Sequence, residues 1–251
     1  MNSWSYKPAR DLNLKTRRRW ASLDRESGLV STVMHQIWWL FVRTYLAVWH
    51  RLEITGREHL PADAPLVLVA NHTSHLDTLA MAAAIPWRLR GRLLPIAAGD
   101  VFFTTPVTSA FSAFMLNALP MWRKNCGSHA LKQLRERLVG DPCVFILFPE
   151  GGRSRDGALM AFKPGLGMIV AGADVPVVPC WLSGCFDAFP PGRKLPRRCR
   201  IRVEIGPPLN FAGVSNDRGG WQQITAETEA AVRRLGPGAE AVSESKSEAA
   251  D

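Results

Sequence analysis

The chain has 251 residues, of which 47% are hydrophobic, and this is ample for the core of one large α/β domain with appendages or of two small domains. The net charge of +9 and the pI near 9.8 indicate an anionic partner, and nine Trp against two Tyr favour a membrane surface over nucleic acid. The five cysteines include no Cys-x-x-Cys pair, so neither a disulfide framework nor a zinc site is indicated, and a reducing, cytoplasmic compartment is expected.

Residues 1–28 predict a basic, partly helical arm, and an apolar helix is expected to follow over residues 29–49. The uncharged run from Ser27 to Val42 is shorter than the roughly 18 to 20 residues that a membrane-spanning helix needs. Along this helix the polar side chains form a narrow stripe and the apolar ones a wide face. Such a helix lies in a membrane interface or docks into a groove, and a core-packing helix is the alternative. The basic arm beside it favours the membrane, so residues 1–51 form one predicted unit.

Residues 52–235 alternate between apolar strands and amphipathic helices, which predicts an α/β domain with a mixed, mostly parallel sheet flanked by helices. The expected strands are 52–54, 66–70, 93–98, 118–122, 143–148, 175–181 and 201–205. The expected helices are 76–84, 108–116, 128–139, 165–172 and 224–235. We expect a basic surface patch at residues 87–92 and a disordered tail at residues 236–251.

The stretch 101–122 is uncharged and long enough to cross a membrane. Pro106, Asn117 and Pro120 interrupt it, which favours a helix followed by a buried strand. Re-entrant membrane contact is the alternative.

A polar turn with Asn71, His72 and Asp77 follows the apolar run 66–70. The carboxyl end of a buried parallel strand is where α/β proteins place their chemistry. A carboxylate beside a histidine orients the imidazole and stabilises the imidazolium, so this pair suits general base catalysis. We therefore predict that His72 is a base. A helix cap at Asn71 or Thr73 with solvated histidines is the alternative.

A second polar turn follows the apolar run that ends at Phe148. Gly151 and Gly152 permit close approach of the backbone, and the planar guanidinium of Arg153 suits a phosphate. Glu150, directly after a buried strand, indicates a placed carboxylate. A solvated hairpin is the alternative.

In this order the two turns resemble the lysophospholipid acyltransferase family, which includes the 1-acyl-glycerol-3-phosphate acyltransferases. The resemblance covers residues 52–209 and four motifs. The matching residues are Asn71, His72 and Asp77 in the first, Arg123 in the second, Phe148 to Gly151, Arg153 and Ser154 in the third, and Val175 to Pro179 in the fourth. Gly152 stands where Thr is usual, and residues 97–100 lack a Lys that many members carry.

The resemblance implies the glycerolipid acyltransferase fold and an enzyme associated with the cytoplasmic face of a membrane, without a cofactor or metal. It implies acyl-CoA or an acyl-carrier protein as acyl donor and a lysophospholipid as acceptor. It assigns the base to His72 and its orientation to Asp77. The implied substrate-binding residues are Arg123, Glu150, Gly151, Gly152, Arg153 and Ser154.

Three alternatives stay open at this point. Lysophosphatidate is the expected acceptor, but another lysophospholipid or an amine- or sugar-headed lipid is possible because of the departures in the motifs. A lipid hydrolase would use His72 and Asp77 with water. A basic membrane or nucleic-acid module without chemistry is the third, although the basic clusters lack interleaved aromatic side chains for base stacking.

Overall fold

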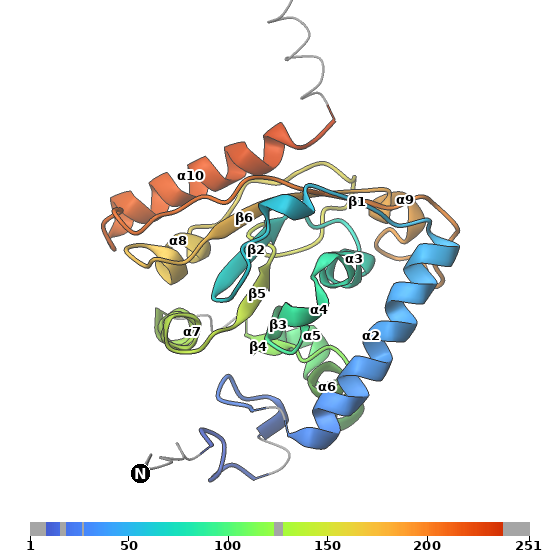
Figure 1. The fold of residues 1–251 in the computed structure, drawn as a ribbon, viewed down its shortest axis with the longest axis horizontal. Helices are drawn as coiled ribbons and strands as arrows, with labels where there is room; N and C mark the ends of the chain where they lie inside the picture. The colour runs from blue at the N-terminus through green and yellow to red at the C-terminus, as the bar shows by residue number, and fades with distance from the viewer. Residues whose placement is uncertain (1–8, 16–18, 27, 123–127, 238–251) are drawn as a thin grey trace, which may run out of the picture.

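The computed structural model describes residues 9–15, 19–26, 28–122 and 128–237, and this part of the chain holds a seven-stranded sheet (Figure 1). The strands are β1 (Glu53–Thr55), β2 (Leu66–Ala70), β3 (Leu93–Ala98), β4 (Leu119–Met121), β5 (Val144–Leu147), β6 (Val177–Ser183) and β7 (Arg202–Ile205). Their order is β1-β7-β6-β2-β5-β3-β4. Strands β2 to β6 are parallel, β7 runs antiparallel to β6, and β1 is parallel to β7. The predicted mixed, mostly parallel sheet is confirmed.

Helices lie on both sides of this sheet (Figure 1). On one side α2 (Leu29–Trp49) packs against α3 (Leu76–Ala84) and α6 (Pro106–Phe114). On the other side α8 (Gly165–Val170) packs between α7 (Ser128–Gly140) and α10 (Arg218–Arg234). The remaining short helices of the described ranges are η1 (Arg57–His59), α4 (Trp87–Arg90), α5 (Gly99–Phe102) and α9 (Cys185–Ala188).

The central strands are apolar on both faces because each face is covered by helices. All five residues of β2 are buried. Leu68 belongs to the core on the side of α2 and α3, where Trp39 is also buried. Val67 and Val69 belong to the core on the side of α7, α8 and α10, together with Phe145.

The long helix α2 buries a narrow stripe and leaves its wide apolar face exposed. The buried residues are Ser31, His35, Trp39, Val42 and Leu46. The exposed apolar residues are Leu29, Val30, Val33, Met34, Ile37, Leu40, Phe41, Val48 and Trp49. The two polar residues of this stripe contact carbonyl oxygens: the Ser31 hydroxyl donates to Gly28 at 2.7 Å, and the Nδ1 atom of His35 lies 2.9 Å from the carbonyl oxygen of Met115. The Nε2 atom of His35 is buried without a hydrogen-bond partner in the described ranges.

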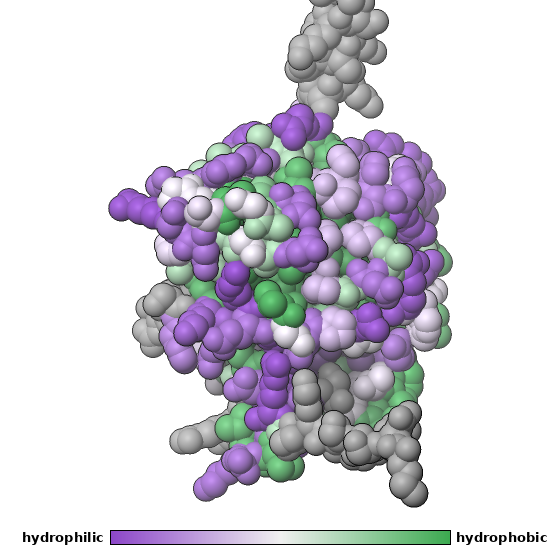
Figure 2. Space-filling view, turned by 60° about the vertical axis from the view of Figure 1, so that its left-hand side comes forward, coloured by the Kyte–Doolittle hydropathy of each residue, from purple (hydrophilic) through white to green (hydrophobic). Residues whose placement is uncertain are grey.

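The surface on the other side of the molecule is more hydrophilic than the exposed face of α2. Figure 2 shows the surface over α7, α8 and the start of α10, where hydrophilic side chains predominate and hydrophobic ones form only small patches. Within the described ranges, no helix combines the length and the hydropathy needed to cross a bilayer.

Part of the predicted basic arm packs on the domain. The buried guanidinium of Arg25 donates hydrogen bonds to the carbonyl oxygens of Ala113 and Ala118 and to the Asn117 side chain. The Arg137 guanidinium in turn donates to the carbonyl oxygen of Arg25 at 2.8 Å. These contacts tie residues around 25 to α6, to the segment between α6 and β4, and to α7, so this portion of the arm is packed on the domain.

The expectation of a basic surface patch at residues 87–92 is wrong for Arg90, which is 1% exposed. Its guanidinium donates to the carbonyl oxygen of Ile85 and lies 5.9 and 5.7 Å from the ring centroids of Trp39 and Trp87. Aromatic faces stabilise a buried guanidinium, so an apparently solvated arginine enters the core.

Two further segments bear on the sequence reading. The stretch 101–122 forms α6 and then β4, and β4 pairs in parallel with β3, so the predicted helix and buried strand are confirmed. Helix α10 begins at Arg218 rather than at residue 224. The Asp217 side chain caps it by accepting a hydrogen bond from the Gly220 N–H, and this cap offsets the helix-breaking tendency of Gly219 and Gly220.

Candidate active site

Two polar turns meet at one edge of the sheet, because β2 lies between β5 and β6 and all three strands are parallel. The turn after β2 carries Asn71 to Asp77, and the turn after β5 carries Pro149 to Ser154. The backbone joins them directly, since the Ser154 N–H donates to the carbonyl oxygen of His72 at 2.8 Å. The structure thus brings together the two turns that the sequence singled out.

Asn71 fixes the first turn to β6 and does not cap a helix. Its side-chain amide donates to the carbonyl oxygen of Leu182 at 2.9 Å and accepts from the Leu182 N–H at 2.8 Å. These two bonds continue the pairing of β2 and β6 by one step through a side chain. The following residue, His72, therefore leaves the sheet at a fixed position.

His72 and Asp77 form the predicted pair. The Nδ1 atom of His72 lies 2.9 Å from Oδ2 of Asp77. A carboxylate oxygen can only accept, so Nδ1 carries the proton and Nε2 keeps a free lone pair. The His72 side chain is 18% exposed and the Asp77 side chain 0%. The arrangement presents the basic nitrogen of an imidazole that is held from behind by a buried carboxylate.

Asp77 is fixed by the turn that it closes. Its Oδ2 atom also accepts the backbone N–H groups of Thr73 and Ser74, at 2.6 and 2.7 Å. It lies in the first turn of α3, where the helix dipole favours a negative charge. The Oδ1 atom has no hydrogen-bond partner among the described residues, and the buried thiol of Cys185 lies beside the carboxylate. Cys185 is a neighbour of the site that the sequence did not reveal.

Glu150 links the two turns through backbone groups. Its Oε1 atom accepts the His72 N–H at 2.6 Å, and its Oε2 atom accepts the Met160 N–H at 3.1 Å. Burial raises the pKa of this carboxyl to about 7, and the negative charges of Asp77 and Glu229 act in the same direction. With both oxygens occupied, the geometry favours a positioning role over a contact with substrate.

Ser154 and Phe148 also hold His72. The Ser154 side chain is buried, and its hydroxyl donates to Asp156 at 2.7 Å. The Phe148 ring stacks on the His72 imidazole with 4.1 Å between the centroids. The backbone of His72 is thus bound on both sides by the second turn, while its ring rests on the residue that starts that turn.

The two glycines of the second turn differ in what lies beside them. Gly151 has a φ of +72°, and a Cβ there would lie 2.6 Å from the ammonium nitrogen of Lys163. A Cβ on Gly152 would meet no heavy atom within 4 Å. Lys163 is therefore a cation over the predicted phosphate-binding turn, and sequence reasoning did not assign it.

Arg153 is half-buried and forms no hydrogen bond or ion pair with any other residue in the described ranges. Burial lowers the pKa of the neighbouring His75 to about 4, and the charge of Arg153 acts in the same direction. The His75 ring lies between those of Phe102 and Phe189, at centroid distances of 5.7 and 6.2 Å. Arg123, the other predicted phosphate ligand, lies outside the described residues.

The nearby nucleophiles are unsuited to form an acyl-enzyme. Burial raises the pKa of the Cys185 thiol well above its usual value, and the Asp77 charge acts in the same direction. The thiol is therefore protonated at neutral pH. The Ser74 hydroxyl is buried and donates to the carbonyl oxygen of Phe189 at 2.7 Å. Across the described ranges, no group of three or more His, Cys, Asp or Glu side chains is placed to hold a metal ion.

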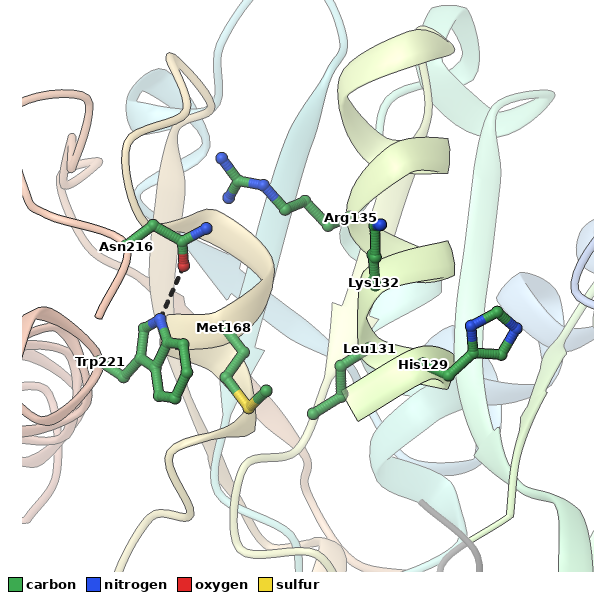
Figure 3. A pocket seen from close by; sticks show the side chains of 7 residues that line it. All are labelled: His129, Leu131, Lys132, Arg135, Met168, Asn216 and Trp221. Atoms are coloured by element: carbon green, nitrogen blue, oxygen red, sulfur yellow. Dashed lines mark hydrogen bonds between the residues drawn. The ribbon is translucent and has the colours of Figure 1, made fainter. Parts of the chain in front are cut away.

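A separate groove of about 370 Å³ lies between α7, α8 and the start of α10 (Figure 3). Lys132 and Arg135 line one wall, and Met168 and Trp221 line the other. None of the predicted site residues lines it. The groove is thus distinct from the edge where the two turns meet.

Comparisons with known proteins match the same region. The model of the family described as Acyltransferase matches residues 51–183. The chain is 28% identical to the 1-acyl-sn-glycerol-3-phosphate acyltransferase alpha of Bos taurus, over 66% of this chain and 57% of that protein. It is 32% identical to a chloroplastic 1-acyl-sn-glycerol-3-phosphate acyltransferase of Arabidopsis thaliana, over 64% of this chain and 44% of that protein.

The fold is also similar to that of a solved structure. It is the 1-acyl-sn-glycerophosphate acyltransferase PlsC of Thermotoga maritima, with a TM-score of 0.61 and 24% identity. The match covers 82% of this chain and 78% of that one. By contrast, the chain spans only 57 to 58% of the length of the mammalian relatives that it matches.

Proposed function

This chain belongs to the acyltransferase family, and we propose that it transfers a fatty acyl chain from a thioester to the free hydroxyl of a lysophospholipid. The pair of His72 and Asp77 carries this proposal, because it supplies an oriented base at the edge of the sheet. The relatives are named for 1-acyl-glycerol-3-phosphate, so we propose this acceptor and phosphatidate as the product.

In the proposed first step, Nε2 of His72 takes the proton of the acceptor hydroxyl as its oxygen attacks the thioester carbonyl carbon. Asp77 holds the Nδ1 proton and stabilises the imidazolium that forms. A positioned base of this kind contributes a factor of roughly 10² to 10⁴ in rate. The step gives a tetrahedral oxyanion and a protonated His72.

In the second step, the oxyanion collapses and the carbon–sulfur bond breaks. The thiolate leaves with both electrons of that bond and takes the proton from His72, which restores the base. The result is an ester and a free thiol. Direct transfer is supported by the buried, protonated state of Cys185 and by the buried hydroxyl of Ser74.

The acceptor's phosphate is proposed to bind at the second turn. Arg153 offers a planar guanidinium without another partner in the described ranges, and Lys163 adds an ammonium beside Gly151. The open surface at Gly152 gives the substrate access to the backbone. Arg123 is proposed as a further phosphate ligand on the basis of the motif alone.

A membrane surface is the proposed location of the reaction, because the acceptor is a lipid. The exposed apolar face of α2 supports this location: Ile37, Leu40 and Phe41 are 66, 65 and 61% exposed. A helix with such a face lies in the interface between headgroups and acyl chains. The basic composition of the chain suits anionic headgroups on the cytoplasmic face.

The test is an acceptor panel with purified protein. Lysophosphatidate and lysolipids with other headgroups are each offered acyl-CoA and acyl-carrier protein, and the phospholipid product is measured. The proposal expects product from lysophosphatidate with at least one donor and little free fatty acid when the acceptor is omitted. Free fatty acid without any acceptor would instead show a hydrolase. Transfer confined to another headgroup would overturn the proposed acceptor.

A further inference from the structure

The loop of residues 190–200, here the basic loop, connects the candidate active site to the end of α2. At its start, the carbonyl oxygen of Phe189 accepts the Ser74 hydroxyl next to the catalytic pair. At its end, the carbonyl oxygen of Cys199 lies 3.0 Å from Nδ1 of His50, which follows α2 directly. Figure 1 shows this loop after α9, beside the C-terminal end of α2.

The basic loop presents cations beside one exposed apolar side chain. Leu195 is 76% exposed, its sequence neighbours Arg193 and Lys194 are exposed, and so is Arg198 nearer the end of the loop. The Nε atom of Arg193 donates to the carbonyl oxygen of Leu195, which fixes the backbone at the tip of the loop. The loop is thus ordered with a leucine directed away from the core.

Two of these cations are available for a partner. Lys194 and Arg198 form no hydrogen bond or ion pair with another residue of the described part of the chain. Other arginines near the loop are already paired: Arg197 with Asp187, and Arg200 and Arg202 with Glu53. Lys194 lies next to Leu195 at the tip, whereas Arg198 lies nearer the base of the loop, where the Arg197 N–H donates to the carbonyl oxygen of Ala188.

This combination fits an anionic lipid surface. Long cationic side chains reach headgroup phosphates while a neighbouring leucine enters the acyl boundary, and each cation near an anionic bilayer strengthens binding. At the neighbouring end of α2, Val48 and Trp49 are 69 and 46% exposed. In Figure 1 the basic loop and the C-terminal end of α2, which are far apart in sequence, lie on the same side of the molecule.

We propose that the basic loop is a second membrane-contact element, which binds anionic headgroups, inserts Leu195 and seats the entrance of the active site on the bilayer. The inference rests on the membrane association of the proposed function and assigns part of it to a segment outside α2. The hydrogen bond between the Ser74 hydroxyl and the carbonyl oxygen of Phe189, at the start of the loop, would then hold the turn with His72 near the same membrane surface.

The test measures co-sedimentation of the purified full chain with vesicles of phosphatidylcholine, alone or mixed with phosphatidylglycerol. The double variant Arg193→Glu/Lys194→Glu is expected to weaken binding to the mixed vesicles by at least about tenfold, because each cation lost and each anion gained opposes the surface charge. Leu195→Ser is expected to weaken binding to both kinds of vesicle. Unchanged thermal unfolding of these variants shows that the fold is intact.

The matched control is Arg218→Glu/Arg234→Glu, which changes the net charge equally at exposed positions of α10. It is expected to bind the mixed vesicles nearly as well as the wild type. Equal losses in both double variants would show a general charge effect and overturn the inference. Unchanged vesicle binding of the loop variant would also overturn the inference. This holds even if the variant loses activity with acyl-carrier protein as donor, because the loop would then bind the carrier protein and not the membrane.

The outcomes separate the inference from the proposed function. If the wild type binds neither vesicle, the proposed membrane association fails together with the inference. If the wild type binds and the loop variants bind equally well, only the inference fails. Acyl transfer itself is measured independently with the acceptor panel.

Discussion

Replacing Glu150 by Ala tests whether this carboxylate positions His72 or contacts the substrate. In the structure its two oxygens accept the N–H groups of His72 and Met160, at 2.6 and 3.1 Å. The substitution removes both acceptors inside a buried site, since Glu150 is 3% exposed. The immediate consequence is two buried N–H groups without partners.

The magnitude follows from the shorter of the two bonds. An unpaired buried donor costs about 1 to 3 kcal/mol, and the shorter bond, to the His72 N–H, is the one that bears on the position of the base. If the cost of the unpaired His72 N–H is expressed as a displaced imidazole, the rate falls roughly 10- to 100-fold, since 1.4 kcal/mol corresponds to a factor of ten. We therefore expect kcat to fall by this factor with little change in the KM for the acceptor.

The assay is steady-state acyl transfer over a range of acceptor concentrations, with two companion variants. Glu150→Gln keeps one acceptor oxygen and should recover part of the lost kcat. Glu229→Ala is the matched control, because the Glu229 carboxylate accepts the Phe162 N–H at 2.8 Å and has no hydrogen bond to His72. This control should leave kcat close to the wild-type value.

A different result would refute the positioning role. If Glu150→Ala raises the acceptor's KM and leaves kcat unchanged, Glu150 binds substrate, as the motif alone suggests. If Glu229→Ala lowers kcat as much as Glu150→Ala, a general loosening of the loop is responsible.

Three further predictions follow from the geometry. Arg153→Ala should raise the KM for a phosphate-bearing acceptor by at least about tenfold, while Arg155→Ala should not, and equal effects in steady-state kinetics would remove Arg153 from the phosphate site. Gly151→Ala should lower both activity and melting temperature, because the residue has a φ of +72° and the new Cβ would displace Lys163; a melting temperature equal to that of the wild type would contradict this. Burial lowers the pKa of His35 from 6.5 to about 4, so the unfolded chain binds this proton more readily than the folded protein does. The contribution of His35 to the free energy of unfolding is therefore at its maximum above pH 6.5, and it falls by up to about 3 kcal/mol as the pH drops to about 4. Urea unfolding should show this loss in the wild type, and the loss should be smaller in His35→Gln; the same loss in both proteins would refute the assignment.

The sequence predicts the sheet well because its central strands are apolar at successive positions. The run 66–70 is apolar at every position, and only a strand covered on both faces accommodates it. The sequence predicts the start of α10 too late, because Gly219 and Gly220 indicate a loop and the cap at Asp217 becomes evident only from its hydrogen bond. Such a cap depends on one side chain, and two adjacent glycines disfavour a helix at the same place.

Burial of charge is the feature that the sequence conceals. Arg90 lies in a run that is typical of a solvated surface, yet it is buried between Trp39 and Trp87. Trp39 is remote in sequence and belongs to α2, so local composition contains no sign of this contact. The same holds for Arg25, whose three acceptors lie in α6 and in the segment between α6 and β4.

For the candidate site, the sequence identifies the pair of His72 and Asp77 and misses the groups that hold this pair in place. His72 and Asp77 lie in one turn, and their spacing suffices to predict their contact once a strand precedes them and a helix follows. The backbone contacts of Glu150 and the place of Cys185 beside Asp77 depend on how separate strands align. The roles of the predicted substrate-binding residues stay predictions.

The rate of acyl transfer by His72→Ala tests the central claim most directly. Purified variant and wild type are compared with lysophosphatidate and an acyl thioester, with thermal unfolding and vesicle binding as controls for the fold and the membrane contact. If Nε2 of His72 is the base, the rate falls by about 10² to 10⁴ while both controls stay at wild-type values. A variant that keeps most of its transfer rate would show that another group removes the proton from the acceptor hydroxyl.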